Sequence, residues 1–273
     1  MKRVNPTDPE ASNYVGMHYT GSIGDVSEVA DFKAYGGYIY IIDKISALLY
    51  CYNSNGDEEW ETEPDVFVSP KGVYLDNSYI YVLDVNGTSG PTGNTLTVIS
   101  TAGSLADFGV NLAADAHKII VDGNYIYTAG TDTITKYNKT ILANMLTVAD
   151  TIGSSGTADG QFMEISDICF NGDTEIVVAD SALDRISFLN LNGGFLRKIE
   201  PGTDIKGIAV KDGILYVPCA AGIVEYSCAN GNKLKTWADY GEGNGKVIKP
   251  SLIDIMESKV YVENGTSIKV FEP

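Results

Sequence analysis

Basic residues are scarce in this sequence. It has 19 Lys and Arg against 36 Asp and Glu, which gives a formal net charge of −17 at pH 7. A surplus of that size repels the phosphate backbone of a nucleic acid and the surface of an anionic membrane. The composition therefore argues against nucleic acid as a partner.

The sequence also lacks a long apolar run. No stretch approaches the roughly 20 consecutive apolar residues that a membrane-spanning helix needs. At the start, Met1-Lys2-Arg3 is followed by VNPTDPE rather than by the apolar core of a secretion signal. We therefore expect synthesis in the cytoplasm without a signal peptide, and no insertion into a membrane.

Histidine and cysteine are rare as well. The two histidines, His18 and His117, are too few for a zinc site of three histidines. The four cysteines stand at no metal-ligand spacing such as CxxC, and three of them fall in apolar, strand-like runs. Since cysteine behaves as a small hydrophobe in cores, free buried thiols are favoured over disulfides. The cysteines are Cys51, Cys169, Cys219 and Cys228.

What the sequence does contain is typical of many short strands joined by tight turns. Hydrophobic residues make up 44%, enough for a sizeable core, and the 29 glycines far outnumber the 9 prolines. Apolar residues alternate with Tyr, Thr, Ser, Asn and Asp in short runs. The expected class is all-β.

One apolar phrase returns along almost the whole chain. Its six copies are residues 38–43, 79–84, 125–130, 175–180, 214–219 and 259–264. The intervals between copies have a mean of about 44 residues, in the range expected of four-stranded propeller blades. A strand-like run precedes each copy and further strand-like runs follow it. The repeat therefore predicts a six-bladed β-propeller with four antiparallel strands per blade.

The sixth copy lacks residues for a fourth strand, because the sequence stops at Pro273. Residues 13–24 have the alternation of an outer strand and precede the first copy. We expect them to complete the last blade and so to leave no long unpaired sheet edge. The predicted organisation is an N-terminal arm, 1–12, and one propeller domain, 13–273.

The fourth copy carries the most specific motif. Residues 156–162 (GTADGQF), 168–170 (ICF), 176–180 (IVVAD) and 184–188 (DRISF) follow one another in order. This stretch resembles an NHL repeat, and the resemblance implies a six-bladed β-propeller. The pattern's Asp180 and Arg185 are expected to pair with each other across a turn, and Phe162 is expected to pack between blades.

Propellers carry their binding sites at the mouths of the central channel. Alignment on the repeated phrase brings six residues to one level there: Glu28, Lys71, His117, Ser166, Lys206 and Ser251. The next level contains Val29, Gly72, Lys118, Asp167, Gly207 and Leu252. If Lys71, His117 and Lys206 converge, we expect them to bind a small anion or a carboxylate-bearing group. The alternative is that they are solvated loop-edge residues paired with nearby acids.

Catalytic signatures are missing from the sequence. It contains no GxSxG, HExxH or Walker motif. The shortage of histidine excludes the amidating-lyase type of propeller. A calcium-dependent, lactonase-like site needs only oxygen ligands, and Glu28, Asp167 and Asp254 are the candidates for that alternative.

These observations favour a non-catalytic propeller that binds proteins or glycans, with no cofactor. The expected role is a structural or decoration subunit of a larger assembly, with a virion component as the narrower hypothesis. The alternative is a metal-dependent hydrolase or lyase with Ca²⁺ in the central channel, so the question of catalysis stays open at this point.

Overall fold

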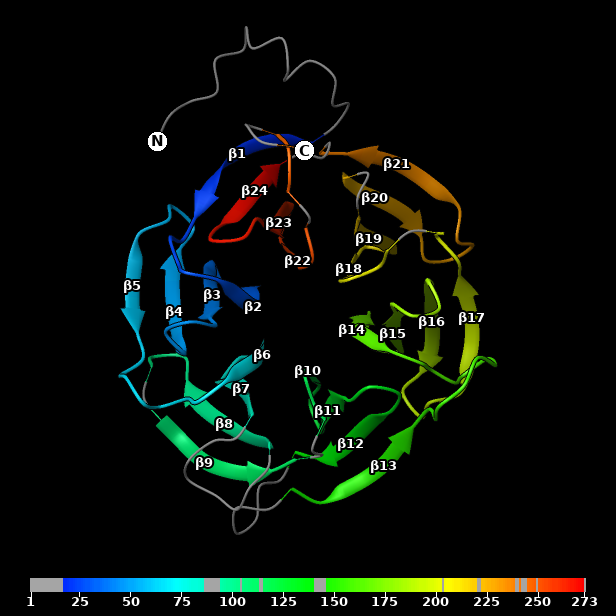
Figure 1. Ribbon diagram of the computed structural model, residues 1–273, viewed down its shortest axis with the longest axis horizontal. Helices are drawn as coiled ribbons and strands as arrows, with labels where there is room; N and C mark the ends of the chain where they lie inside the picture. The colour runs from blue at the N-terminus through cyan, green and yellow to red at the C-terminus, as the bar shows by residue number, and fades with distance from the viewer. Residues whose placement is uncertain are drawn as a thin grey trace, which may run out of the picture.

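The computed structural model describes residues 17–85, 94–103, 105–112, 115–139, 146–202, 204–219, 222–238, 241, 245–248 and 250–272. All regular elements in these ranges are β-strands. They form six four-stranded antiparallel sheets arranged as blades around a central channel (Figure 1). The all-β class and the six-bladed propeller expected from the repeat are confirmed. None of the described residues form a helix long and apolar enough to cross a membrane.

We number the blades 1 to 6 in chain order and call the strands of a blade a to d, from the channel outwards. Blade 1 contains β2 (Val29–Tyr35), β3 (Tyr38–Asp43), β4 (Leu48–Asn53) and β5 (Glu58–Glu61). Blade 2 contains β6 (Pro70–Leu75), β7 (Tyr79–Val85), β8 (Asn94–Ser100) and β9 (Leu105–Asn111). Blade 3 contains β10 (Lys118–Val121), β11 (Tyr125–Ala129), β12 (Ile134–Asn138) and β13 (Val148–Ile152).

The second half of the ring follows the same order. Blade 4 contains β14 (Ile165–Asn171), β15 (Glu175–Asp180), β16 (Arg185–Asn190) and β17 (Phe195–Ile199). Blade 5 contains β18 (Ala209–Lys211), β19 (Ile214–Cys219), β20 (Gly222–Ser227) and β21 (Lys233–Trp237). Blade 6 takes β22 (Ile253–Met256), β23 (Lys259–Glu263) and β24 (Ile268–Glu272) from the end of the chain and β1 (His18–Ile23) from its beginning.

The outer strand of blade 6 pairs the two ends of the described chain (Figure 1). In β1, His18 lies opposite Glu272 and Ile23 lies opposite Ile268, in antiparallel register. Of the strand expected over residues 13–24, positions 13–16 lie outside the described residues, as does the arm 1–12.

Strand b is deeply buried in every blade, because neighbouring blades cover both of its faces. In β3, every residue after Tyr38 is buried. Side chains of adjacent blades meet between the sheets, as in the cluster that joins Ile134 of blade 3 to Ile176 of blade 4. Phe162 is fully buried in this cluster, which confirms the expectation that it packs between blades.

The ring has two chemically distinct ends. The turns between strands b and c, and the crossovers from strand d to the next strand a, lie at one end, which we call the crossover end. The turns between strands a and b lie at the opposite end, the hairpin end. At the crossover end, strand b of four blades carries a carboxylate at or next to its last residue, and that carboxylate accepts a backbone N–H group of the incoming crossover. The four residues are Asp43, Asp84, Asp180 and Glu263.

The structure gives Asp180 and Arg185 separate partners, so the pair expected from the sequence does not form. Asp180 accepts the N–H groups of Met163 and Leu183 at 2.8 and 3.1 Å. Arg185 donates to the carbonyl of Thr157 at 2.9 Å and to other carbonyls of the crossover. Both side chains are buried, and each satisfies backbone groups of the crossover that enters blade 4.

Candidate functional site

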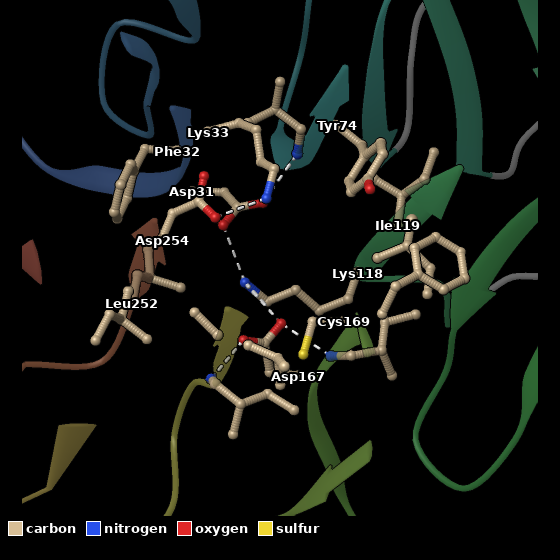
Figure 2. A pocket seen from close by; sticks show the side chains of 18 of the residues that line it. Asp31, Phe32, Lys33, Tyr74, Lys118, Ile119, Asp167, Cys169, Leu252 and Asp254 are labelled. Carbon is tan, nitrogen blue, oxygen red and sulfur yellow. Dashed lines mark hydrogen bonds and ion pairs between the residues drawn. The ribbon is translucent and has the colours of Figure 1, made fainter. Parts of the chain in front are cut away.

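The innermost strands of all six blades line a cavity of about 180 Å³ in the central channel (Figure 2). Most of the residues that line it are apolar, but charged side chains project into it from blades 1, 3, 4 and 6. These side chains are Asp31, Lys33, Lys118, Asp167 and Asp254, which we call the channel cluster. The cluster carries three carboxylates and two ammonium groups in a largely buried setting.

Asp254 joins blade 6 to blade 1. Its Oδ1 lies 2.7 Å from the Nζ of Lys33, and its Oδ2 accepts the N–H of Ala34 at 2.8 Å. The carboxylate therefore uses one oxygen for a charge and the other for a backbone donor of the next blade. The Lys33 Nζ also lies 5.2 Å from the centre of the Tyr74 ring in blade 2.

Lys118 of blade 3 joins two carboxylates across the channel. Its Nζ lies 3.0 Å from Oδ1 of Asp31 and 3.9 Å from Oδ1 of Asp167. Figure 2 shows its side chain extending between the two. Because Lys118 contacts acids from blades 1 and 4, a single ammonium group connects blades that are not adjacent in the ring.

The three aspartates share a second role. Asp31 of blade 1 accepts the N–H of Val73 in blade 2, and Asp167 of blade 4 accepts the N–H of Ile208 in blade 5, each at 2.9 Å. Asp254 does the same for blade 1. In each case a carboxylate on one strand a bonds the backbone at the inner edge of the next blade, so the channel cluster fastens neighbouring blades together.

The charges of the cluster depend on one another. Burial alone would lower the pKa of Lys33, but the Asp254 carboxylate raises it above its ordinary value. The pKa of Lys118 is likewise raised by Asp31 and Asp167 against the effect of burial. Burial raises the pKa of Asp167, and Lys118 only partly opposes this. Both lysines are therefore cationic at neutral pH.

A thiol also lines the cavity. All four cysteines are free; Cys169 is partly buried and faces the channel, and the other three are buried. Burial raises the pKa of the Cys169 thiol well above its ordinary range, and the nearby Asp167 carboxylate adds to this. The thiol is therefore protonated at neutral pH and is a weak nucleophile there.

The strand pairing corrects two residues of the sequence alignment, both in blade 1. The level that contains Lys118 and Asp167 was expected to include Val29, but in blade 1 it contains Asp31, which lies opposite Ile42 just as Gly72 lies opposite Leu83. Val29 itself pairs with Asp43, as Pro70 pairs with Asp84 in blade 2. Ala30 is the bulged residue that matches Lys71, so it takes the place that was assigned to Glu28. The alignment therefore missed Asp31 and also Lys33. Polar residues at alternate positions of strand a were the available signal.

In blades 2 and 5, the position equivalent to Lys118 and Asp167 is a glycine, and the next blade comes close to it. A Cβ on Gly207 would lie 2.3 Å from the carbonyl oxygen of Ser251, and one on Gly72 would lie 3.2 Å from that of His117. Side chains are therefore sterically restricted in blades 2 and 5, and the charged groups come from the other blades.

The residues expected at the channel mouth lie on the crossover side of this cluster. Lys71 and Ser166 occupy bulges, where strand a carries an unpaired residue. Lys71 is exposed, whereas the Ser166 hydroxyl donates to the Ile205 carbonyl at 3.3 Å. Because a bulge redirects a side chain away from the regular alternation, these two positions do not continue the inward-facing set.

The remaining channel-mouth candidates have partners close by. Glu28 lies 2.5 Å from Lys44, and Lys206 lies 2.8 Å from Asp204. The His117 ring contacts the Ile165 carbonyl at 2.8 Å through Nε2, and Ser251 contacts Glu263 at 3.0 Å. These contacts are with neighbouring residues of the rim; none of them joins Lys71, His117 and Lys206 to one another.

Two of the three candidate calcium ligands, Asp167 and Asp254, do line the cavity. Each already contacts a lysine and a backbone N–H, and the third, Glu28, contacts Lys44. Over the part of the chain that the structure describes, no three His, Cys, Asp or Glu side chains are grouped so that they could hold a metal ion. The geometry of the cluster supports a role in holding neighbouring blades together more directly than it supports metal binding.

No family model matches the chain, and no curated protein matches it either. Solved structures do: 896 chains match, so the fold alone does not single out a function. One of them is described as the crystal structure of the computationally designed Ika8 protein. It is 11% identical to this chain, and the match covers 94% of this chain and 100% of that one with a TM-score of 0.56. At this identity the likeness shows the β-propeller fold only.

Proposed function

We propose that this chain is a non-catalytic propeller that binds proteins or glycans as a structural subunit of a larger assembly, and that its crossover end is the surface that joins the assembly. The observation that carries the proposal is a set of exposed aliphatic side chains at that end. They are Ile45, Val68, Met163 and Ile248, with exposed fractions of 66, 43, 44 and 36%.

Three of these side chains occupy equivalent places in the repeat. The N–H groups of Val68, Met163 and Ile248 each donate to the side chain that follows or ends strand b of the blade they enter. The acceptors are Asp84, Asp180 and Asn264, at 3.0, 2.8 and 3.1 Å. The crossover backbone is thereby fixed while the aliphatic side chain points outward, and a pre-ordered apolar surface loses less entropy on binding.

Single exposed aliphatic residues are normal on any protein surface. Their recurrence on the same loop of three blades is a property of the repeat, and it fits a partner that contacts several blades at once. Apolar contact of this kind suits a protein partner at the crossover end. The assembly that we propose contains many copies of a decoration subunit, and a virion is one particle of this kind.

The channel cluster supports a non-catalytic role. Its carboxylates accept backbone N–H groups and contact lysines, so their hydrogen-bonding capacity already serves the joints between blades. An aspartate that acted as a general base or a metal ligand would have to give up one of these contacts between blades. We therefore assign the cluster to the integrity of the ring.

Site-directed photo-crosslinking tests the proposal. A benzophenone amino acid replaces Met163 at the crossover end or, as the control, Leu196 on β17, which has a similar exposed fraction of 46%. After irradiation in a native extract of the source organism, we expect a discrete product of higher mass from position 163 and none from position 196. Ile45→Asp should abolish that product and leave the melting temperature unchanged.

Equal crosslinking at both positions, or a chain that stays a free 29.3 kDa species in the extract, would contradict the proposal. Calcium-dependent turnover of a lactone by the isolated chain would favour the hydrolase instead.

A further inference from the structure

Three tyrosines occupy equivalent places on three consecutive blades at the hairpin end. Tyr38, Tyr79 and Tyr125 are the first residues of β3, β7 and β11. Tyr38 and Tyr79 have exposed fractions of 40 and 41%, and Tyr125 is half-buried. This end of the ring is opposite the one assigned above to protein contact.

The rings are held in place by a second tyrosine. Residues two apart on a strand share a face, and each outer ring packs against a buried ring two positions on. The three ring-centre distances are 6.4, 6.5 and 6.3 Å, for Tyr38–Tyr40, Tyr79–Tyr81 and Tyr125–Tyr127. The outer rings therefore lose little conformational freedom when a ligand covers them.

Hydrogen-bonding groups connect the hairpin turns that carry these rings. The Tyr35 hydroxyl of blade 1 donates to the Asn77 side-chain oxygen of blade 2. Lys139 of blade 3 donates to the Asp76 carboxylate of blade 2 at 2.7 Å and to the Asp122 carbonyl at 3.1 Å. The turns of the three blades are thus joined by amide, carboxylate and ammonium groups.

The other three blades do not continue this surface. The equivalent positions are Glu175, Ile214 and Lys259. Glu175 pairs with Arg197 at 2.7 Å and Lys259 pairs with Glu272 at 2.8 Å, so two of these positions form ordinary ion pairs within their own blades. Exposed rings at this register are therefore confined to one half of the ring.

We propose that this surface, the tyrosine arc of Tyr38, Tyr79 and Tyr125 with Tyr35, Asn77 and Lys139, binds a neutral oligosaccharide. A sugar ring has an apolar face that stacks on an aromatic ring and hydroxyl groups that need donors and acceptors. The tyrosine arc offers both. Exposed tyrosine supplies large amphipathic contact area at low entropic cost, which suits it to recognition.

The charge of the chain specifies the class of glycan. A net charge of −17 repels sulfated and phosphorylated chains, and the Asp76 carboxylate neutralises the Lys139 ammonium at the arc. Lys136 covers one face of Tyr125, with its Nζ 4.0 Å from the ring centre, so Tyr38 and Tyr79 present the more open rings. The inference deepens the proposed binding function but uses the opposite end of the ring, so either can fail without the other.

Titration calorimetry and saturation-transfer NMR on the full chain test the proposal. The probes are uncharged hexasaccharides of β-1,4-linked glucose, β-1,4-linked N-acetylglucosamine and α-1,4-linked glucose, with a heparin hexasaccharide as the polyanionic comparison. We expect at least one neutral probe to bind and heparin not to bind. Tyr79→Ala and Tyr38→Ala should each weaken binding about tenfold, a loss of about 1.4 kcal/mol.

Two further variants separate stacking from folding. Tyr79→Phe keeps the ring and should bind within about threefold of the unchanged chain, because stacking needs no hydroxyl. Lys259→Ala alters the equivalent position of blade 6 and should bind with unchanged affinity. All variants should keep the far-ultraviolet circular dichroism spectrum of the unchanged chain.

Several results would overturn the proposal. They are a failure of every neutral probe to bind at about 10 mM, preferential binding of heparin, or equal losses from Tyr79→Ala and Lys259→Ala. Crosslinking of a protein from a benzophenone at position 79 in the native extract would also overturn it and would assign the arc to a protein partner.

Discussion

The innermost and outermost strands of the ring use charged side chains in different ways. On strand a, Asp31, Asp167 and Asp254 are almost buried, and each bonds the backbone of the next blade. On the outer strand β17, Lys198 contacts Asp159 and Glu200 at 3.3 and 3.2 Å with two fifths of its side chain exposed. The same repeat thus places ion pairs in two different environments, one largely buried and one exposed to water.

The difference shows where charge determines the architecture. Water screens the outer pairs, and exposed pairs of this kind contribute little to stability. In the channel, removal of one partner leaves an uncompensated charge or donor in a poorly hydrated site, which is costly. The inner strands therefore depend on a complete set of partners, whereas the outer strands tolerate substitution.

The strongest test of this contrast is Asp254→Ala. The change leaves the Lys33 ammonium and the Ala34 N–H without their acceptor, and we expect the free energy of unfolding to fall by about 3 kcal/mol. Lys198→Ala on β17 is the matched outer change, and it should leave the urea midpoint unchanged. Urea unfolding followed by circular dichroism measures both. Equal shifts of the two midpoints would show that inner and outer pairs are equivalent.

Trp237 sharpens the comparison because it is a buried residue on an outer strand. Its ring lies 5.2 Å from that of Phe271 in blade 6, and its Nε1 donates to Glu225 at 2.9 Å. Trp237→Ala should cost about 3 kcal/mol through the cavity it leaves. The same change at Trp60, the partly buried tryptophan of β5, should cost less. A larger loss at Trp60, measured by thermal unfolding, would contradict the assignment of burial as the cause.

Much of the architecture could be predicted from the sequence, because each copy of the repeated phrase consists of consecutive residues. A strand buried on both faces must be apolar throughout, so strand b could be recognised in every copy. The count of copies then predicted the number of blades. The strands that pair within a blade follow from their antiparallel order along the chain, so this pairing could be predicted as well.

The channel cluster could not be predicted in the same way. Its contacts join residues of different blades, such as Lys33 and Asp254, which are far apart in sequence. Strand β2 carries the same bulge as β6 and β14, and such an insertion leaves no mark in the composition of a strand. Asp180 and Arg185 show the same limit, because their partners are backbone groups of a crossover.

The hairpin end allows a smaller test through pH. Burial opposes ionisation of Asp76, but the Lys139 ammonium and backbone N–H groups lower its pKa from 3.8 to about 2. Because the pKa is lower in the folded state, the stabilisation is complete above 3.8 and is lost as the pH falls towards about 2. Asp76→Asn should lose about 1–2 kcal/mol at neutral pH. Its stability should approach that of the unchanged chain near pH 2; a constant difference would contradict this.

Asp167 should show the opposite dependence on pH, with the smallest effect. Burial raises its pKa in the folded state, with Lys118 opposing and Asp31 adding to the rise. The folded chain therefore holds a proton that the unfolded chain releases, and stability falls as the pH rises from the ordinary value of 3.8 through the raised pKa. Asp167→Asn has no such proton to release.

The comparison of Asp167→Asn with the unchanged chain isolates this effect. The amide retains one oxygen for the Ile208 N–H, so the variant has a constant cost from the lost contacts with Lys118 and Ile168. Over the acid range the variant should gain on the unchanged chain as the pH rises, and the difference should become constant above the raised pKa. Thermal unfolding at closely spaced pH values measures it. A difference that shrinks as the pH falls would place Asp167 with Asp76, and the inner strand would then have no distinct electrostatic character at this position.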